Sequence, residues 1–305
     1  MKKMTVTIFA CALCAALALS GCGSTAASSS LACAPAPETK PQDKAILVVS
    51  FGTSYNESRD RTIGAIENAI QTAFPEYETR RAFTSQIIID KLAKRDNLVI
   101  DNVEQALDRA VSDGIKTLVV QPTHLMKGYE YTDLVTALEE YQAKFEQLVL
   151  AQPLLTAEED FNRVIGAITA QTAVYDDGKT AICFMGHGTE ANSNGVYAKM
   201  QKMLTAQGHT NYYVGTVEAT PTLEELMCAV KAGDYTKVVL EPLMVVAGDH
   251  ANNDMAGDDE DSWKSQFEAA GYEVECVLRG LGEFTDIQSI YVSHTQAAID
   301  SLTAK

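Results

Sequence analysis

Two histidines in the second half of the chain each follow an apolar segment and stand between glycine-rich residues. His187 comes after the run 181–185, and His250 comes after the run 238–247. Uninterrupted apolar runs of this length are typical of buried strands in parallel sheets. The loop after such a strand is where an open α/β sheet binds its ligands. We therefore expect the two imidazoles to share one site.

A carboxylate between these histidines completes the candidate site. Glu218 ends the segment 212–217 and stands one strand–helix repeat from His187 and one from His250, so the three side chains can leave successive repeats at the same edge of a sheet. Two imidazoles and a carboxylate suit a divalent first-row transition metal and leave coordination positions open. Each residue alone has an ordinary interpretation, as a loop histidine or a glutamate at a helix N-terminus, but their matched positions favour a metal site.

Two further segments could bind an anionic substrate. Ser50 and Thr53 lie in a strand-to-helix turn whose N–H groups could hold an anion. Arg81 follows the next strand and could pair with substrate carboxylates, since guanidinium groups bind carboxylates with two hydrogen bonds. The chain contains neither the dinucleotide-binding nor the P-loop glycine pattern, so no nucleotide is expected.

The remaining histidines give weaker indications. His124 also follows a strand and could approach the site, although packing at its wall is an equal alternative. His209 and His294 are assigned no role. The acidic run 258–261 could attract a metal ion, but it is better explained as the start of a helix.

Strand and helix patterns alternate throughout the chain from residue 44 onward. Apolar strands are expected near these residues: 45–49, 117–121, 148–151, 181–185, 212–217, 237–240 and 273–278. Residues 54–57 have the pattern of a capping box that opens a helix. The pattern predicts an α/β fold of two similar lobes, 44–173 and 174–305, each a parallel sheet flanked by helices, with the active site in the cleft between them.

The two halves of the chain also resemble each other. Residues 120–122 and the glycine at 128 align with residues 240–242 and the glycine at 248 at a constant offset. In this alignment Phe51 and Glu130 occupy the places of His187 and His250. We interpret this as an internal duplication in which only the second copy keeps both imidazoles.

The N-terminus has the pattern of a bacterial lipoprotein. Residues 1–21 combine two lysines, an apolar stretch and small residues before Cys22, which predicts a signal peptide and lipidation of Cys22. A transmembrane helix is the less favoured alternative, because the apolar stretch is short and no charged stop follows it. Residues 22–43, rich in Ser, Ala and Pro, are expected to form a flexible tether. The folded body is thus expected to be exported and anchored to a membrane of the cell envelope.

Charge and cysteine content restrict the partners. The formal net charge of −17 repels nucleic acid, so no nucleic-acid partner is expected. The three cysteines of the folded part, Cys183, Cys228 and Cys276, have no metal-binding spacing and are expected to be buried free thiols. A homo-oligomer remains possible, since the sequence does not determine the oligomeric state.

Several of these segments together resemble the anaerobic sirohydrochlorin cobaltochelatases, the class II tetrapyrrole chelatases of the CbiK type. The matching segments run from about Ile46 nearly to the C-terminus and comprise residues 48–55, 81–85, 185–188, 217–218 and 246–264. The resemblance implies a metal site at His187, Glu218 and His250, with both histidines catalytic. It also implies insertion of Co²⁺ into sirohydrochlorin without ATP, on the route to cobalamin.

This activity sets chemical requirements. Metal insertion displaces two pyrrole protons, so the site must hold a partly ligated ion beside the ring and accept protons. Sirohydrochlorin carries many carboxylates, for which Arg81 is the first candidate partner. The donor set leaves Fe²⁺ and Ni²⁺ as alternatives to Co²⁺. An exported copy could instead be a carrier of metal or tetrapyrrole without turnover.

Overall fold

The computed structural model describes residues 43–303, which fold around two parallel four-stranded sheets. The expected α/β architecture is confirmed. The first sheet has the order β2-β1-β3-β4, and its strands are β1 (Lys44–Ser50), β2 (Glu78–Phe83), β3 (Thr117–Pro122) and β4 (Gln147–Leu150). The second has the order β6-β5-β7-β8, and its strands are β5 (Thr180–Gly186), β6 (Tyr212–Thr216), β7 (Lys237–Pro242) and β8 (Glu273–Cys276).

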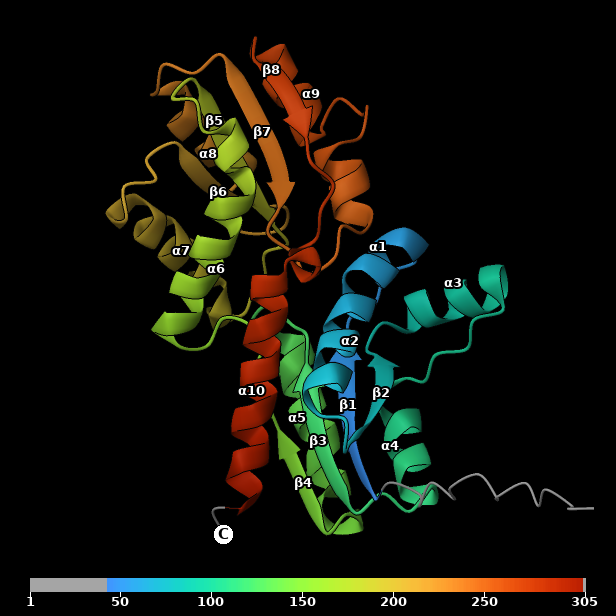
Figure 1. The fold of residues 1–305 in the computed structure, drawn as a ribbon. Coiled ribbons are helices and arrows are strands. Elements are labelled where there is room, and N and C mark those ends of the chain that lie inside the picture. The colour runs from blue at the N-terminus through green and yellow to red at the C-terminus, as the bar shows by residue number, and fades with distance from the viewer. Residues whose placement is uncertain (1–42, 304–305) are drawn as a thin grey trace, which may run out of the picture. The chain divides into compact units, whose positions relative to one another are not determined.

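Helices connect the strands in each repeat (Figure 1). The α-helices are α1 (Asn56–Arg61), α2 (Ile63–Ala73), α3 (Gln86–Asp96), α4 (Val103–Ser112), α5 (Tyr129–Tyr141), α6 (Glu158–Thr172), α7 (Gly195–Ala206), α8 (Leu223–Lys231), α9 (Trp263–Ala269) and α10 (Thr285–Thr303). Short helical turns are η1 (Gln142–Lys144), η2 (Ala173–Tyr175), η3 (Asn192–Asn194), η4 (Ala251–Met255) and η5 (Leu281–Glu283). Within residues 43–303, none of these helices has the length and apolar character needed to cross a bilayer. The signal peptide, Cys22 and almost all of the expected tether lie outside the described residues.

The expected capping box at residues 54–57 is not formed. Helix α1 begins at Asn56, with Tyr55 at the N-cap and without a side-chain cap. The hydroxyl of Thr53 instead accepts a hydrogen bond from the Tyr55 N–H, and the Ser54 carbonyl accepts one from Arg95. A capping box does open α4, where Asn102 and Gln105 satisfy each other's backbone N–H groups.

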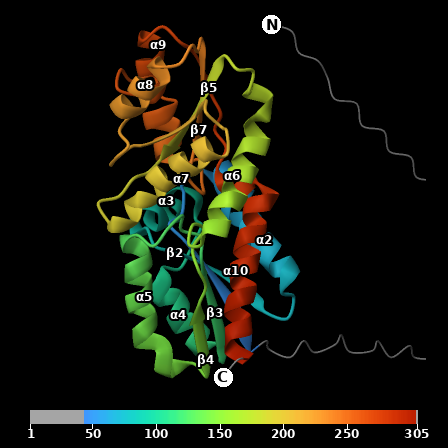
Figure 2. The same ribbon diagram turned by 90° about the vertical axis from the view of Figure 1, so that its left-hand side faces the viewer.

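The long helices α6 and α10 join the two sheets into one core. Helix α6 packs on α7, and Thr172 at its end donates a hydrogen bond to the hydroxyl of Tyr212 in β6. Helix α10 packs on α2 and β3, where the Tyr291 hydroxyl donates to the Thr123 carbonyl at 2.9 Å. Figure 2 shows α6 and α10 side by side. The expected division at residue 173 places α6 in the first lobe and α10 in the second. In the structure α6 packs on the second lobe and α10 packs on the first.

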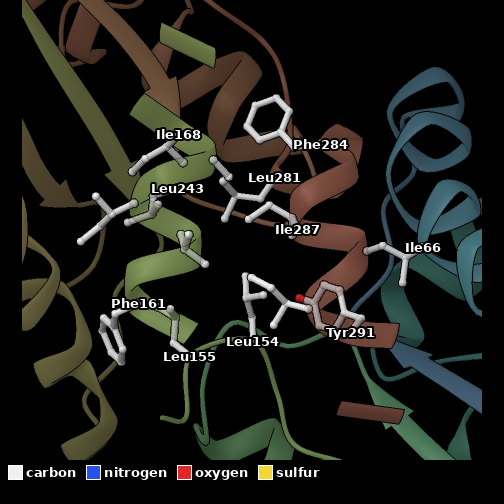
Figure 3. Packing of buried hydrophobic residues seen from close by; sticks show 14 of the residues in the cluster. Ile66, Leu154, Leu155, Phe161, Ile168, Leu243, Leu281, Phe284, Ile287 and Tyr291 are labelled. Carbon is white, nitrogen blue, oxygen red and sulfur yellow. The ribbon is translucent and has the colours of Figure 1, made fainter. Parts of the chain in front are cut away.

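The apolar side chains between these helices come from both halves of the chain. Figure 3 shows Ile168 of α6, Leu243 after β7 and Ile287 of α10 within one buried cluster, which also reaches Ile66 of α2. Each of these four side chains is fully buried. Burying a side chain of this size stabilises a fold by about 1.5–3 kcal/mol, so this shared cluster holds the two sheets in a fixed relation.

The strand register confirms that the two halves are structural repeats. Val49 of β1 pairs with Pro122 of β3, and Met185 of β5 pairs with Pro242 of β7 in the same way. Gln121 and Glu241 consequently occupy equivalent buried positions. Gln121 is satisfied, because its amide group donates to the Pro122 and Gln152 carbonyls and accepts from Thr295.

Glu241 is less well satisfied than its glutamine counterpart. Its side chain is only 2% exposed, and Arg279 contacts Oε1 at 3.0 Å, while Oε2 has no hydrogen-bond partner among the described residues. Burial raises the pKa of Glu241 to about 7, and the nearby Arg279 only partly opposes this shift. The folded protein thus holds a proton on Glu241 that the unfolded chain releases at lower pH.

Replacement of Glu241 by glutamine should remove a pH dependence of stability. The folded-state pKa of about 7 exceeds the ordinary 4.5, so this carboxyl favours folding below pH 4.5, and the advantage is lost as the pH rises toward 7 and above. Relative to Glu241→Gln, we expect the wild-type free energy of unfolding to fall by up to about 3 kcal/mol across this range. Urea denaturation of both proteins between pH 4.5 and 8 measures the difference; parallel curves would contradict the assignment.

Candidate metal and substrate site

His187, Glu218 and His250 converge at the carboxyl edge of the second sheet. They follow β5, β6 and β7 respectively, and one potential ligand atom from each lies within 4.8 Å of the others. The two imidazole rings are 4.7 Å apart between centroids and nearly perpendicular. The structure thus brings together the three side chains that the sequence pattern singled out.

Backbone hydrogen bonds beyond the strand ends position Glu218 beside His187. The N–H of Glu218 donates to the His187 carbonyl at 2.9 Å, which continues the parallel pairing of β5 with β6. Gly188 permits this close approach, because it has a φ of +89° and an added Cβ would lie 2.8 Å from the Ala219 nitrogen. Glu218 Oε2 lies 3.8 Å from His187 Nδ1.

In both imidazole rings a hydrogen bond at Nδ1 fixes the orientation. His187 Nδ1 lies 2.8 Å from the Gly188 carbonyl, and His250 Nδ1 lies 2.7 Å from Asp254 Oδ2. A carbonyl can only accept, so Nδ1 of His187 carries the proton, and a carboxylate beside Nδ1 of His250 favours the same tautomer. Nε2 is consequently the nitrogen of each ring that is free to bind a metal ion.

Asp254 is the residue that the sequence analysis missed. It stands four positions after His250 on the single π-helical turn η4, a type of turn that is frequent at functional sites. Asn252 holds the start of this turn by donating to the Gly248 carbonyl at 2.7 Å. Carboxylates in this position fix the orientation and the tautomer of a metal-binding histidine. A histidine followed by an aspartate at i+4 was the available sequence indication.

The site is open on one side. The side chains of His187 and Glu218 are 48% and 55% exposed, and that of His250 is 31% exposed. Three protein donors fill only part of the coordination sphere of a divalent ion, as in catalytic rather than structural metal sites. The arrangement can therefore hold an ion while a second, larger ligand approaches it.

Arg81 does not take part in this cluster. Its guanidinium donates to both carboxylate oxygens of Glu67 on α2, and the Nε–Oε1 distance is 2.6 Å. It lines a separate hollow together with Leu98 and Asp101. The expectation that Arg81 is free to bind substrate carboxylates is not met, because an acidic residue of its own lobe already neutralises it.

Ser50 and Thr53 are buried rather than available to an anion. The Ser50 hydroxyl accepts a hydrogen bond from Thr123 at 2.8 Å, and Thr53 accepts one from the Tyr55 N–H. Thr53 nevertheless lies at the junction of the two repeats, because its hydroxyl is 3.4 Å from the position that a Cβ on Gly248 would take. Thr53 thus contributes to the contact between the two repeats near His250.

The other histidines lie apart from the three converging side chains. The buried His124 has its Nε2 3.4 Å from Glu130 of α5, and His294 is held between Asp160 and the Gln152 carbonyl. His209 packs its ring against Tyr212. Both ring nitrogens of His124 are buried and have no hydrogen-bond partner among the described residues, so packing alone does not account for this histidine.

Two arginines near the site were not singled out from the sequence. Arg59 and Arg95 both donate to the Asn56 side chain at 2.8 Å. The neighbouring Tyr55 hydroxyl donates across the repeats to Asp249 at 3.4 Å, directly before His250. Burial and the Asp249 charge raise the pKa of Tyr55. These guanidinium groups therefore lie on the side of the first lobe that meets the metal-site loops.

The fold places the chain among proteins built like the tetrapyrrole chelatases. It resembles SirB from Bacillus subtilis with Fe³⁺, with a TM-score of 0.59 at 12% identity over 85% of this chain and 97% of that one. It also resembles CbiX, the terminal enzyme for biosynthesis of siroheme in denitrifying bacteria, with a TM-score of 0.50 at 14% identity over 84% and 99%. At such identities the likeness concerns the fold alone.

Sequence comparison identifies the family. Residues 44–300 match the cobalt chelatase (CbiK) family, and the chain belongs to it. A sirohydrochlorin cobaltochelatase of Salmonella typhimurium is 38% identical over 84% of this chain and 97% of its own length. The cobaltochelatase CbiKC of Nitratidesulfovibrio vulgaris is 32% identical over 87% and 93%. The first 43 residues lie outside the family match.

Loss of the carboxylate that orients His250 should weaken metal binding. We expect Asp254→Asn to lower the affinity for Co²⁺ by about 10–100-fold, because the Asp254 carboxylate beside His250 Nδ1 fixes the ring and its tautomer. Asp258→Asn is the matched control, since Asp258 is a nearby exposed aspartate paired with Lys264. Calorimetric titration with Co²⁺ compares the two variants. Equal losses in both would show that general acidity, not orientation, is responsible.

Proposed function

We propose that this protein is a sirohydrochlorin cobaltochelatase, which inserts Co²⁺ into sirohydrochlorin without ATP. The convergence of His187, Glu218 and His250 at one edge of the second sheet is the observation that carries the proposal. Membership of the cobalt chelatase family and the names of both relatives support the same activity.

The geometry suits the chemistry of metal insertion. The Nε2 atoms of His187 and His250 and the Glu218 carboxylate hold the divalent ion, and the carboxylate offsets part of its charge. As the ring nitrogens bind the metal, two pyrrole protons must leave, and the neutral imidazoles of His187 and His250, once released from the ion, each accept one proton. The open side of the site admits the planar ring, whose nitrogens replace the protein donors in turn.

Substrate carboxylates require local positive charge, since the whole chain carries a net charge of −17. Arg95 lies near the site, because it binds the Ser54 carbonyl beside the loop that meets Asp249. Arg59 is buried and supports the same turn through Asn56. Arg95 is paired through two hydrogen bonds with Asp96, as Arg81 is with Glu67. A ring carboxylate that binds either arginine must therefore share it with an acidic side chain of the protein.

The identity of the metal follows from the relatives rather than from the donor set. Mixed imidazole and carboxylate sites bind Co²⁺, Fe²⁺ and Ni²⁺ in the general affinity order and do not strongly select among them. Both curated relatives are named cobaltochelatases. We therefore propose Co²⁺ as the physiological substrate metal.

Removal of one imidazole should abolish most turnover. We expect His187→Ala to lower kcat/KM for Co²⁺ insertion by about 100-fold or more, because a metal donor and a proton acceptor are both lost. Absorption spectra of sirohydrochlorin mixed with Co²⁺ follow the reaction. His209→Ala is the control, as His209 packs on Tyr212 instead. Stoichiometric binding by the wild type without turnover would favour the alternative of a carrier protein.

We further propose that the enzyme is an exported lipoprotein. The support is the sequence pattern before Cys22 and the fact that the family match begins only at residue 44. Lipidation of Cys22 would hold the catalytic body at a membrane of the cell envelope.

A cysteine substitution tests the anchor. We expect Cys22→Ser to move the protein from the membrane fraction to the soluble fraction and to prevent labelling with a fatty-acid probe. Cys33→Ser is the matched control, since Cys33 lies eleven residues further on in the expected tether. Membrane association of Cys22→Ser at the wild-type level would refute the assignment.

A further inference from the structure

The structural repeat assigns each metal-site residue a counterpart in the first sheet. Register equates Phe51, directly after β1, with His187, directly after β5. The Ser85 N–H donates to the Phe51 carbonyl at 3.2 Å, as the Glu218 N–H does to the His187 carbonyl at 2.9 Å. Ser85 is thus the counterpart of Glu218, a relation that the sequence alignment did not reveal.

The first repeat cannot form an equivalent metal site. Phe51 has no ligand atom, and the Ser85 hydroxyl caps α3 by accepting from the Ile88 N–H. Glu130, the counterpart of His250, lies beside the buried His124. What remains at the position of His187 is a phenyl ring that is 47% exposed. A single exposed apolar side chain is ordinary on a protein surface, whereas several of them at one edge indicate a binding surface.

Other exposed apolar side chains gather at the same edge. Among residues 43–303, the large apolar side chains exposed to solvent include Phe51 after β1, Ile87 at the start of α3 and Tyr129 at the start of α5. Each of them follows the carboxyl end of a strand of the first sheet. These three residues are called the apolar rim below.

The apolar rim lies on the loops that meet the metal-site loops. Thr53, two residues after Phe51, is in contact range of Gly248, two residues before His250. A Cβ added to Gly128, directly before Tyr129, would lie 4.0 Å from the hydroxyl of Ser193, which is in η3 after His187. The arrowheads of β2 and β4 point toward those of β7 and β8, so the two carboxyl edges face each other (Figure 1).

We propose that Phe51 stacks on one face of the tetrapyrrole ring while the ion approaches the opposite face from His187, Glu218 and His250. This inference rests on the proposed function and assigns the residue that positions its substrate. A flat conjugated ring gains from stacking on an aromatic side chain. An apolar face opposite the metal also offers the ion no competing ligand, so only the ring nitrogens can draw it away from the histidines.

Measurements on metal-free substrate isolate this role. We expect Phe51→Ala to raise the Kd for metal-free sirohydrochlorin by about tenfold, equivalent to about 1.4 kcal/mol, and to raise KM for the ring by a similar factor. The affinity for Co²⁺ alone should stay at the wild-type value. Phe51→Tyr, which keeps the aromatic face, should restore binding. Val174→Ala is the matched control, because Val174 is 81% exposed and lies in η2, away from the apolar rim.

The outcomes separate this inference from the function itself. Wild-type ring affinity in Phe51→Ala would overturn the stacking role while the enzyme continued to turn over. Equal losses of Co²⁺ and ring affinity would also overturn it, since the side chain would then support the metal site instead. Absence of turnover in the wild type would refute the proposed function, whatever the binding data showed.

Discussion

The hydrogen bond from the Glu218 N–H to the His187 carbonyl is the contact on which the site depends. It extends the pairing of β5 with β6 past the strand ends and so carries the register of the sheet into the loops. Because a parallel sheet aligns the carboxyl ends of its strands, His250 after β7 meets the same point. The ligand geometry is therefore a property of the sheet, and the loops need only keep their glycines and their short hydrogen bonds to carbonyl and carboxylate groups.

The same backbone framework serves two different chemistries in the two repeats. Phe51 and His187 stand at equivalent positions, with Ser85 and Glu218 beside them in equivalent hydrogen bonds. One edge offers nitrogen and oxygen donors, and the other offers a phenyl ring. In the proposed complex, one face of the substrate ring meets the metal donors and the other face meets the phenyl ring. The two repeats that supply these side chains have nearly the same backbone. Gln121 and Glu241 show the same divergence inside the core.

Much of this could be predicted from the sequence. Apolar runs before His187 and His250 indicated parallel strands, and strand–helix spacing placed Glu218 between them, because sheet geometry is regular. The pairing of Arg81 with Glu67 could not be predicted, because Glu67 lies on a helix and the sequence does not show which charges neutralise each other. The packing of α6 and α10 was also out of reach, since an amphipathic helix does not reveal which of two apolar sheets it will cover.

The packing of α6 and α10 restricts how the tetrapyrrole ring can enter the site. Helix α6 connects β4 to β5 and packs on α7, whereas α10 follows β8 and packs on α2 and β3. Hydrogen bonds of Thr172 and Tyr291 fasten these helices to the second and first sheet respectively. A wide swing of one half away from the other would expose the cluster around Ile287 to water. A large planar molecule must therefore enter through small movements of the facing loops, while α6 and α10 keep the two sheets in a fixed position.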